Sequence, residues 1–149
     1  MDSQKRGAIK SKFMLQPKRM KFAKAFRGRR RGAAPRGFSL AFGDFGLKAT
    51  EVGWVASNQI EAARRAITHG LRKGGRTWVR IFPDKPVSSR AAGKRMGGGK
   101  GDVSEYVAVV RPGRIMFEIA GTSEEIAKHC LRAASNKLPI ATRIVSKEG

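Results

Sequence analysis

Nine residues near the middle of the chain have the residue types that cradle a phosphate in nucleotide-binding enzymes. The stretch KRMGGGKGD, residues 94–102, holds four glycines and three cations beside one acid. A P-loop needs a glycine six positions before its lysine and a Ser or Thr directly after it. With Lys100 as that lysine, the two positions hold Lys94 and Gly101. The dinucleotide fingerprint fails too, because Asp102 stands where its third glycine belongs.

Other residues that could do chemistry are few and scattered. His69 and His129 each fall in a predicted helix beside other charges, where a histidine is more often a solvated or partly packed side chain. Cys130, the single cysteine, excludes an internal disulfide and, near Ile126 and Leu131, is most simply a core residue. Two histidines and one cysteine form no zinc-ligand set at a recognisable spacing. We therefore expect no catalytic residues, no metal and no cofactor.

The charge of the chain is strongly positive. It has 32 Lys and Arg against 11 Asp and Glu, which gives a formal net charge of +21. Residues 1–36 hold thirteen of the cations and one acid, Asp2, so we expect a basic N-terminal arm at 1–36 and one domain at 37–149. A surplus this large implies a polyanionic partner, most often nucleic acid. No membrane is expected, because the longest apolar run, YVAVV, is too short to span one.

The arm is either a solvated tail or an RNA-binding segment. Its sequence PKRMKFAKAFRGRRRGAAPRGF mixes Lys and Arg with Phe22 and Phe26 and contains no acid. Each phosphate that such cations neutralise adds to affinity, and arginine also stacks on unpaired bases, which favours folded RNA. Two rival functions are an enzyme acting on RNA, which would need a clustered acid–base set, and a DNA-compacting protein, which should bind DNA as well as RNA.

Two helices are predicted to position these charges. The stretch SNQIEAARRAITHGLRKGG has a cap at Ser57 or Asn58 and a Gly-Gly stop. The residues that recur at helical spacing on its one apolar face are Ile60, Ala63, Ile67 and Leu71. In the second helix Thr122 and Glu125 predict a capping box. This helix should run to about Lys137, and its apolar side should hold Ile126, Cys130 and Ala134.

Alternating apolar residues predict the strands. FSLAFGDFGLKA, residues 38–49, indicates a bent or bulged strand, and residues 78–82 indicate a strand that PDKP ends, followed by the glycine-rich loop. YVAVV, the turn RPG and RIMFEI predict two antiparallel strands joined tightly, and LPIATRIV predicts a short last strand. Together these elements predict an α+β fold, a two-layer sandwich of a largely antiparallel sheet with two helices.

Seven blocks of this sequence resemble one known family. They are MLQPKR (14–19), FGDFGLKA (42–49), QIEAARRAI (59–67), WVRIFPDKP (78–86), RMGGGKG (95–101), RPGRIMFEI (111–119) and KLPIATRIV (137–145). In this order and spacing, they are similar to the bacterial-type protein sixteen of the large ribosomal subunit, a family shared with mitochondria and plastids. Residues 1–13 precede the family start. They are an extra RNA-binding tail, a remnant of an organellar targeting sequence, or the product of an upstream start codon.

The resemblance implies a hammerhead-like α+β fold and a structural role in the large ribosomal subunit. The implied partners are large-subunit ribosomal RNA (rRNA), the tRNA acceptor arm and neighbouring large-subunit proteins, with no small-molecule substrate. It also implies support for tRNA accommodation near the peptidyl transferase centre, on a ribosome in a bacterial cytoplasm or an organelle.

The resemblance further implies which residues bind RNA. The rRNA-binding cations would be Lys18, Arg19, Lys21, Lys24, Arg27, Arg29, Arg30, Arg31 and Arg36 of the arm, Arg64 and Arg65 of the first helix, and Lys73, Arg76 and Lys85. The loop facing tRNA and the peptidyl transferase centre would consist of Lys94, Arg95, Met96, Gly97, Gly98, Gly99, Lys100 and Gly101. Its glycines would let the backbone approach RNA closely, while Arg95 and Lys100 neutralise phosphates.

Overall fold

The computed structural model describes residues 16, 32–71, 74–89 and 102–147. This part of the chain forms two helices and seven strands, which confirms the α+β class. The elements in chain order are β1 (Phe45–Ala49), β2 (Gly53–Ala56), α2 (Ser57–Leu71), β3 (Arg76–Val79), β4 (Lys85–Ser89), β5 (Asp102–Val110), β6 (Ile115–Ala120), α3 (Glu124–Ser135) and β7 (Thr142–Ser146).

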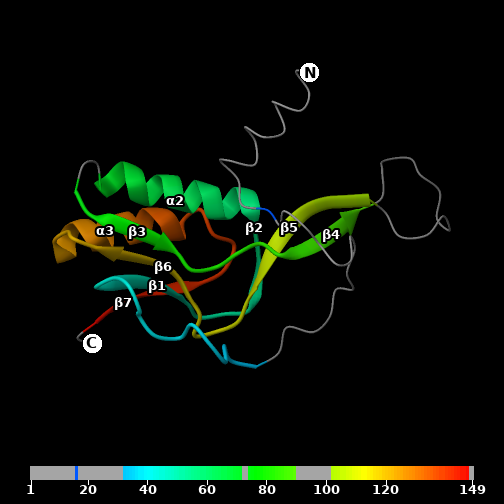
Figure 1. Ribbon diagram of the computed structural model, residues 1–149, viewed down its shortest axis with the longest axis horizontal. Helices are drawn as coiled ribbons and strands as arrows, with labels where there is room; N and C mark the ends of the chain where they lie inside the picture. The colour runs from blue at the N-terminus through cyan, green and yellow to red at the C-terminus, as the bar shows by residue number, and fades with distance from the viewer. Residues whose placement is uncertain (1–15, 17–31, 72–73, 90–101, 148–149) are drawn as a thin grey trace, which may run out of the picture.

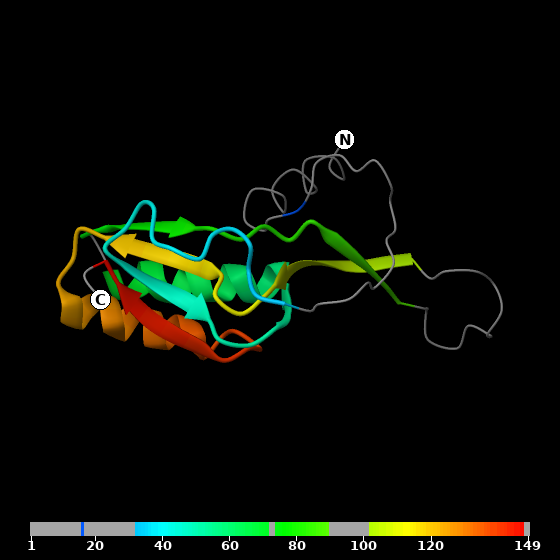
Figure 2. The same cartoon turned by 90° about the horizontal axis from the view of Figure 1, so that it is seen from below.

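The strands form two antiparallel sheets, where the sequence had suggested one. The larger sheet has the order β3-β6-β1-β7, and the smaller has the order β2-β5-β4. Both helices lie on the same face of the larger sheet, and β4 and β5 project away from this body as a two-stranded arm (Figure 1). The view from below shows the same arrangement, with the projecting strands at the end opposite α3 (Figure 2). The molecule therefore has a packed body and a protruding strand pair.

Helix α2 forms where the apolar periodicity predicts it. All four residues of the predicted face, Ile60, Ala63, Ile67 and Leu71, are buried in the main core. They face Leu47, Phe117 and Leu131, among other core residues, and such burial removes apolar surface from water. This helix therefore holds its remaining face, with its arginines, outside the core.

Helix α3 differs from the prediction at its start. Its N-cap is Ser123, whose Oγ accepts the Ile126 N–H, so the predicted capping box of Thr122 and Glu125 is wrong. The buried face of α3 consists of Ala127, Cys130, Leu131 and Ala134, whereas Ile126, predicted on this face, is 46% exposed. Cys130 is buried, which confirms its core position.

The strands around the two prolines also differ from the prediction. β3 ends at Val79, although the Arg80 N–H still donates to Met116 O, and the irregular residues 80–84 include Pro83, which has no N–H to donate to a ladder. β4 then begins at Lys85, inside the PDKP sequence that was expected to end a strand. Pro86 is tolerated there because β4 is an edge strand, bonded only to β5 among the described strands.

The predicted hairpin of β5 and β6 is wrong. β5 pairs with β2 and β4, whereas β6 pairs with β1 and β3, so the two strands belong to different sheets. The turn between them has Gly113 in a left-handed conformation (φ 97°), and the Gly113 N–H donates to Ala49 O. This bond holds the turn against the end of β1. The chain then continues into β6, which pairs with β1, instead of back along β5. The bent strand predicted for 38–49 is regular only from Phe45, and β2 was not predicted.

Candidate nucleic-acid interface

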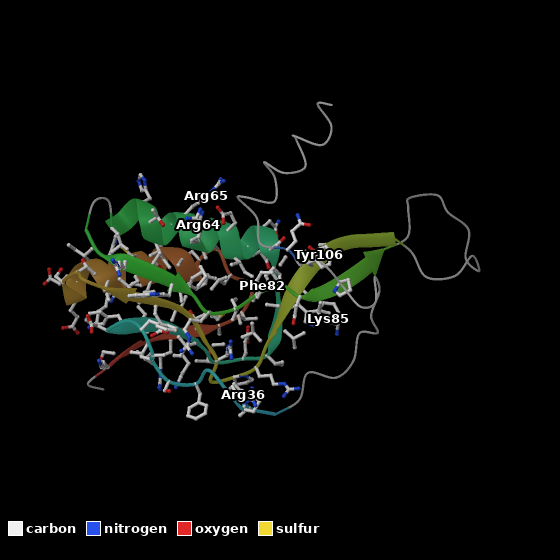
Figure 3. All side chains as sticks on the ribbon, viewed as in Figure 1. Arg36, Arg64, Arg65, Phe82, Lys85 and Tyr106 are labelled. Carbon is white, nitrogen blue, oxygen red and sulfur yellow. The ribbon has the colours of Figure 1, made fainter. Side chains whose placement is uncertain are left out.

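The structure describes five of the predicted RNA-binding cations, Arg36, Arg64, Arg65, Arg76 and Lys85. The others lie outside the described residues: Lys18, Arg19, Lys21, Lys24, Arg27, Arg29, Arg30, Arg31, Lys73 and the whole loop from Lys94 to Gly101. Figure 3 shows Arg64 and Arg65 together above α2, Lys85 at the projecting strands, and Arg36 on the other side of the body. Of the labelled cations, only Arg64 and Arg65 are brought together.

A single carboxylate fixes this arginine pair. Glu61, only 8% exposed, pairs with Arg64 through Nε–Oε2 (3.0 Å) and Nη2–Oε1 (2.5 Å) contacts, and Arg65 Nε lies 3.1 Å from Oε1. The Arg64 hydrogen bond lowers the pKa of Glu61 against the opposing effect of burial, and the same bond raises the pKa of Arg64. Both guanidinium groups remain accessible, with side chains 36% and 66% exposed. They are therefore held in place while facing solvent.

The remaining three cations sit in different surroundings. Lys85 lies over the Trp54 ring, with its Nζ 4.8 Å from the ring centroid, a cation–π contact at the base of the projecting strands. Arg76 is exposed at the start of β3. Arg36 is exposed in the segment before β1, and its backbone carbonyl accepts a bond from Arg114 Nη1 at 3.1 Å.

A second carboxylate that sequence reasoning missed organises the segment that leads into β1. Glu118 on β6 is fully buried, and its Oε1 accepts the N–H groups of Ala41, Phe42 and Gly43 at 2.9, 3.1 and 3.1 Å. Its Oε2 forms an ion pair with Arg80 Nε at 3.1 Å. The sequence did contain a signal for this role, because Glu118 is a lone acid among the apolar residues of RIMFEI. A carboxylate that is buried in a strand requires hydrogen-bond or ion-pair partners.

Arg80 and Arg114 continue this network toward the surface. Arg80 Nη1 donates to Ser39 O at 2.7 Å, and Arg114 Nη2 donates to Arg80 O at 2.7 Å. Burial lowers the pKa of Arg114, and the nearby positive charge of Arg80 lowers it further. Neither arginine was predicted as a site residue, because what places them is their contact with segments far apart in the sequence.

Between α2 and the segment after β3 lies a groove of about 790 Å³. We call it the aromatic groove and define it by Phe42, Trp78, Phe82, Arg64 and Arg80, which line it together with Ile60, Glu61, Val79, Ile81 and Arg114. The Phe42 and Trp78 rings are stacked, with centroids 6.0 Å apart and planes at 22°. Arg80 lies 5.6 Å from the Phe42 centroid. Aromatic rings and guanidinium groups thus line one opening together.

The described part of the chain has neither a metal-binding cluster nor a membrane-spanning helix. No group of three or more His, Cys, Asp or Glu residues there could hold a metal ion. No helix there is long and apolar enough to cross a membrane. The side-chain chemistry that is gathered in this part is cationic and aromatic.

Comparison with known proteins places the chain in a family. A family model described as ribosomal protein L16p/L10e matches residues 17–145. The chain belongs to this family. Two relatives in Dehalococcoides mccartyi, strains BAV1 and CBDB1, are both named large ribosomal subunit protein uL16. Each is 57% identical to this chain over 135 residues, which are 91% of either protein.

Membership of the L16p/L10e family confirms the resemblance seen in the sequence. The matched range contains the arginine pair, the aromatic groove and the glycine-rich loop, and it begins three residues after Met14, the family start expected from the sequence. The protein is a ribosomal protein and not an enzyme, which removes the rival interpretation of an enzyme acting on RNA.

Proposed function

We propose that this chain is a structural constituent of the large ribosomal subunit that binds large-subunit rRNA and supports tRNA accommodation near the peptidyl transferase centre. Its membership of the L16p/L10e family and relatives named as large-subunit proteins support the first part. The net charge of +21 supports an RNA partner. The observed α+β body is compatible with the hammerhead-like fold that the resemblance implies.

The arginine pair of α2 is the observation that carries the RNA-binding proposal. A guanidinium group donates in a planar fork that matches two phosphate oxygens, and it stays charged at every physiological pH. Glu61 holds Arg64 and Arg65 in place, so less side-chain entropy is lost when they bind. Two fixed, accessible cations on adjacent positions suit consecutive phosphates of a folded RNA backbone.

The other predicted cations would extend this contact. Arg76 begins β3 and Lys85 begins β4, whereas Arg36 precedes β1 on the other side of the body from the arginine pair (Figure 3). An RNA that reaches all of them has to surround the protein. The arm residues from Lys18 to Arg31, together with Lys73, would add phosphate contacts. Ribosomal RNA surrounds its proteins in this way more readily than a straight duplex does. Neighbouring large-subunit proteins would contact the faces that RNA leaves free. The ribosome would be that of a bacterial cytoplasm or of an organelle.

The glycine-rich loop would serve the tRNA part of the function. β4 ends at Ser89, β5 begins at Asp102, and these two residues are paired. The sequence between them includes Lys94 to Gly101 and therefore connects the outer ends of the projecting strands. A strand pair that protrudes from the body can carry a loop to a partner that the body itself does not touch (Figure 1).

Competitive reconstitution tests the rRNA part. Large subunits depleted of this protein are incubated with equal amounts of wild type and an Arg64→Ala/Arg65→Ala variant, and the two are quantified by mass spectrometry. We expect wild type to be enriched, because each lost phosphate contact weakens binding. The control is Arg143→Ala, which removes one exposed arginine from β7, an edge strand of the larger sheet and not part of α2. Equal incorporation of the double variant would contradict the proposal.

The tRNA part has its own test in Arg95→Ala. The substituted subunits should assemble normally but accommodate aminoacyl-tRNA more slowly, because one phosphate-neutralising charge of the loop is missing. Rapid kinetics at limiting aminoacyl-tRNA measures this step. An unchanged accommodation rate would refute the role of the loop and leave the rRNA proposal standing.

A further inference from the structure

The aromatic groove exposes rings that a soluble domain would ordinarily bury. Phe42 is 61% exposed and Phe82 is 46% exposed, although both belong to segments that pack against the body. Phe82 lies between the arginine pair of α2 and the projecting strands (Figure 3). Both rings line the same groove. Exposed apolar side chains that are gathered in this way, unlike ones scattered singly over a surface, indicate a binding site.

The exposed Phe42 ring is held by the buried Glu118 carboxylate described above. Three N–H bonds to Glu118 fix the backbone at Phe42, and the ion pair with Arg80 fixes the guanidinium group that lies over the Phe42 ring. The Trp78 ring stacks against Phe42, whose side chain is still 61% exposed. A flat ring anchored in this way is available for stacking without first losing conformational freedom, so a planar ligand meets a preformed surface.

The charges at the groove select the class of ligand. Four arginines, Arg64, Arg65, Arg80 and Arg114, stand against two acids, Glu61 and Glu118, which leaves two positive charges in or beside the groove. An apolar peptide would satisfy the rings but would leave this charge unmatched. A nucleotide satisfies both, because its base is planar and its phosphate is anionic.

We infer that the aromatic groove binds one unpaired nucleotide of rRNA, with its base stacked on the Phe42–Trp78 pair and its phosphate at Arg64. This inference rests on the proposed function and names a specific site within it. Paired bases are not available for such stacking, so the nucleotide comes from a bulge, a loop or a junction. A groove of about 790 Å³ lies within the size range of pockets that take small-molecule ligands.

A fluorescent RNA tests the inference on the full chain. The probe is an RNA hairpin with one bulged 2-aminopurine and a fluorescein at its end, and the control RNA has the 2-aminopurine paired in the stem. Fluorescein anisotropy reports binding of either RNA, while 2-aminopurine quenching reports stacking. We expect saturating wild type to quench the bulged probe at least twofold and to leave the paired probe unchanged.

Matched leucine variants locate the stacking. Phe42→Leu and Phe82→Leu keep an apolar side chain at exposed positions, so folding should be retained and can be verified by thermal melting. Phe38→Leu is the control, because Phe38 is 56% exposed but does not line the groove. Loss of one stacking partner should weaken binding of the bulged probe by about fivefold or more for Phe42→Leu, while Phe38→Leu binds as wild type does.

Each outcome separates this inference from the proposed function. Quenching that persists in both groove variants would place the stacking elsewhere, for instance on Phe22 or Phe26, and would overturn the inference. Anisotropy that reports binding without quenching in wild type would overturn it as well and leave RNA binding intact. Failure of wild type to bind either RNA would overturn the inference and the proposed function together.

Discussion

Glu118 is the residue on which the aromatic groove depends most. Its carboxylate has no solvent access and accepts three N–H groups while pairing with Arg80. We expect Glu118→Ala to lower the free energy of unfolding by about 3–5 kcal/mol, because Arg80 and three backbone donors lose their partner. Glu118→Gln keeps one acceptor oxygen, so its free energy of unfolding should fall by less than that of the alanine variant. Urea denaturation measures both, and an alanine variant within 1 kcal/mol of wild type, roughly the value of one hydrogen bond, would contradict this assignment.

Glu61 contributes stability that depends on pH. Its pKa in the folded protein lies below the ordinary value of about 4.5, chiefly because Arg64 donates to its carboxylate. A lowered folded pKa stabilises the protein above the unfolded pKa, and this contribution is lost as pH falls through the folded pKa. The stability advantage of wild type over Glu61→Gln should therefore be constant at neutral pH and shrink below about pH 4.5. Unfolding curves at several pH values measure it, and an advantage that does not change with pH would argue against the pairing.

The contact between α2 and α3 depends on a glycine. A Cβ at Gly70 would lie 2.5 Å from the Sγ of Cys130, which is fully buried. Alanine favours a helix by about 1 kcal/mol over glycine, yet we expect Gly70→Ala to destabilise the protein by about 1–3 kcal/mol because the two helices must separate. The double variant Gly70→Ala/Cys130→Ala removes the obstructing sulfur and should be more stable than the sum of the single changes implies. Additive effects in urea unfolding would show that the helices do not meet at this point.

At the scale of elements, periodicity predicted α2 and its buried face because the pattern lies within one continuous segment. The strand pairing was not predictable in this way, since β5 and β6 pair with strands far away in the chain, and the turn between them bonds to Ala49. The same difference between local and long-range contacts explains which residues of the candidate site could be predicted. Arg64 and Arg65 were found from a local block, whereas Glu118 acquires its role from backbone groups 75 to 77 residues earlier.

For the whole molecule, the charge predicts how RNA binding depends on salt. A phosphate contact releases counterions, so each lost contact reduces the slope of log affinity against log salt by about one. We expect Arg64→Ala and Arg65→Ala each to reduce the slope by about this amount on large-subunit rRNA. Arg143→Ala removes the same charge from β7 and should change the slope less. Filter binding across a salt series measures this, and equal changes in all three variants would mean that net charge alone governs binding.

Sedimentation of the tagged full chain tests the central claim most directly. Lysate is run through a high-salt sucrose gradient, with RNase-treated lysate in parallel. A structural protein of the large subunit that binds rRNA should travel with the large subunit in high salt and move to the top of the gradient after RNase treatment. Protein that stays at the top without RNase, or that follows DNA, would contradict the account.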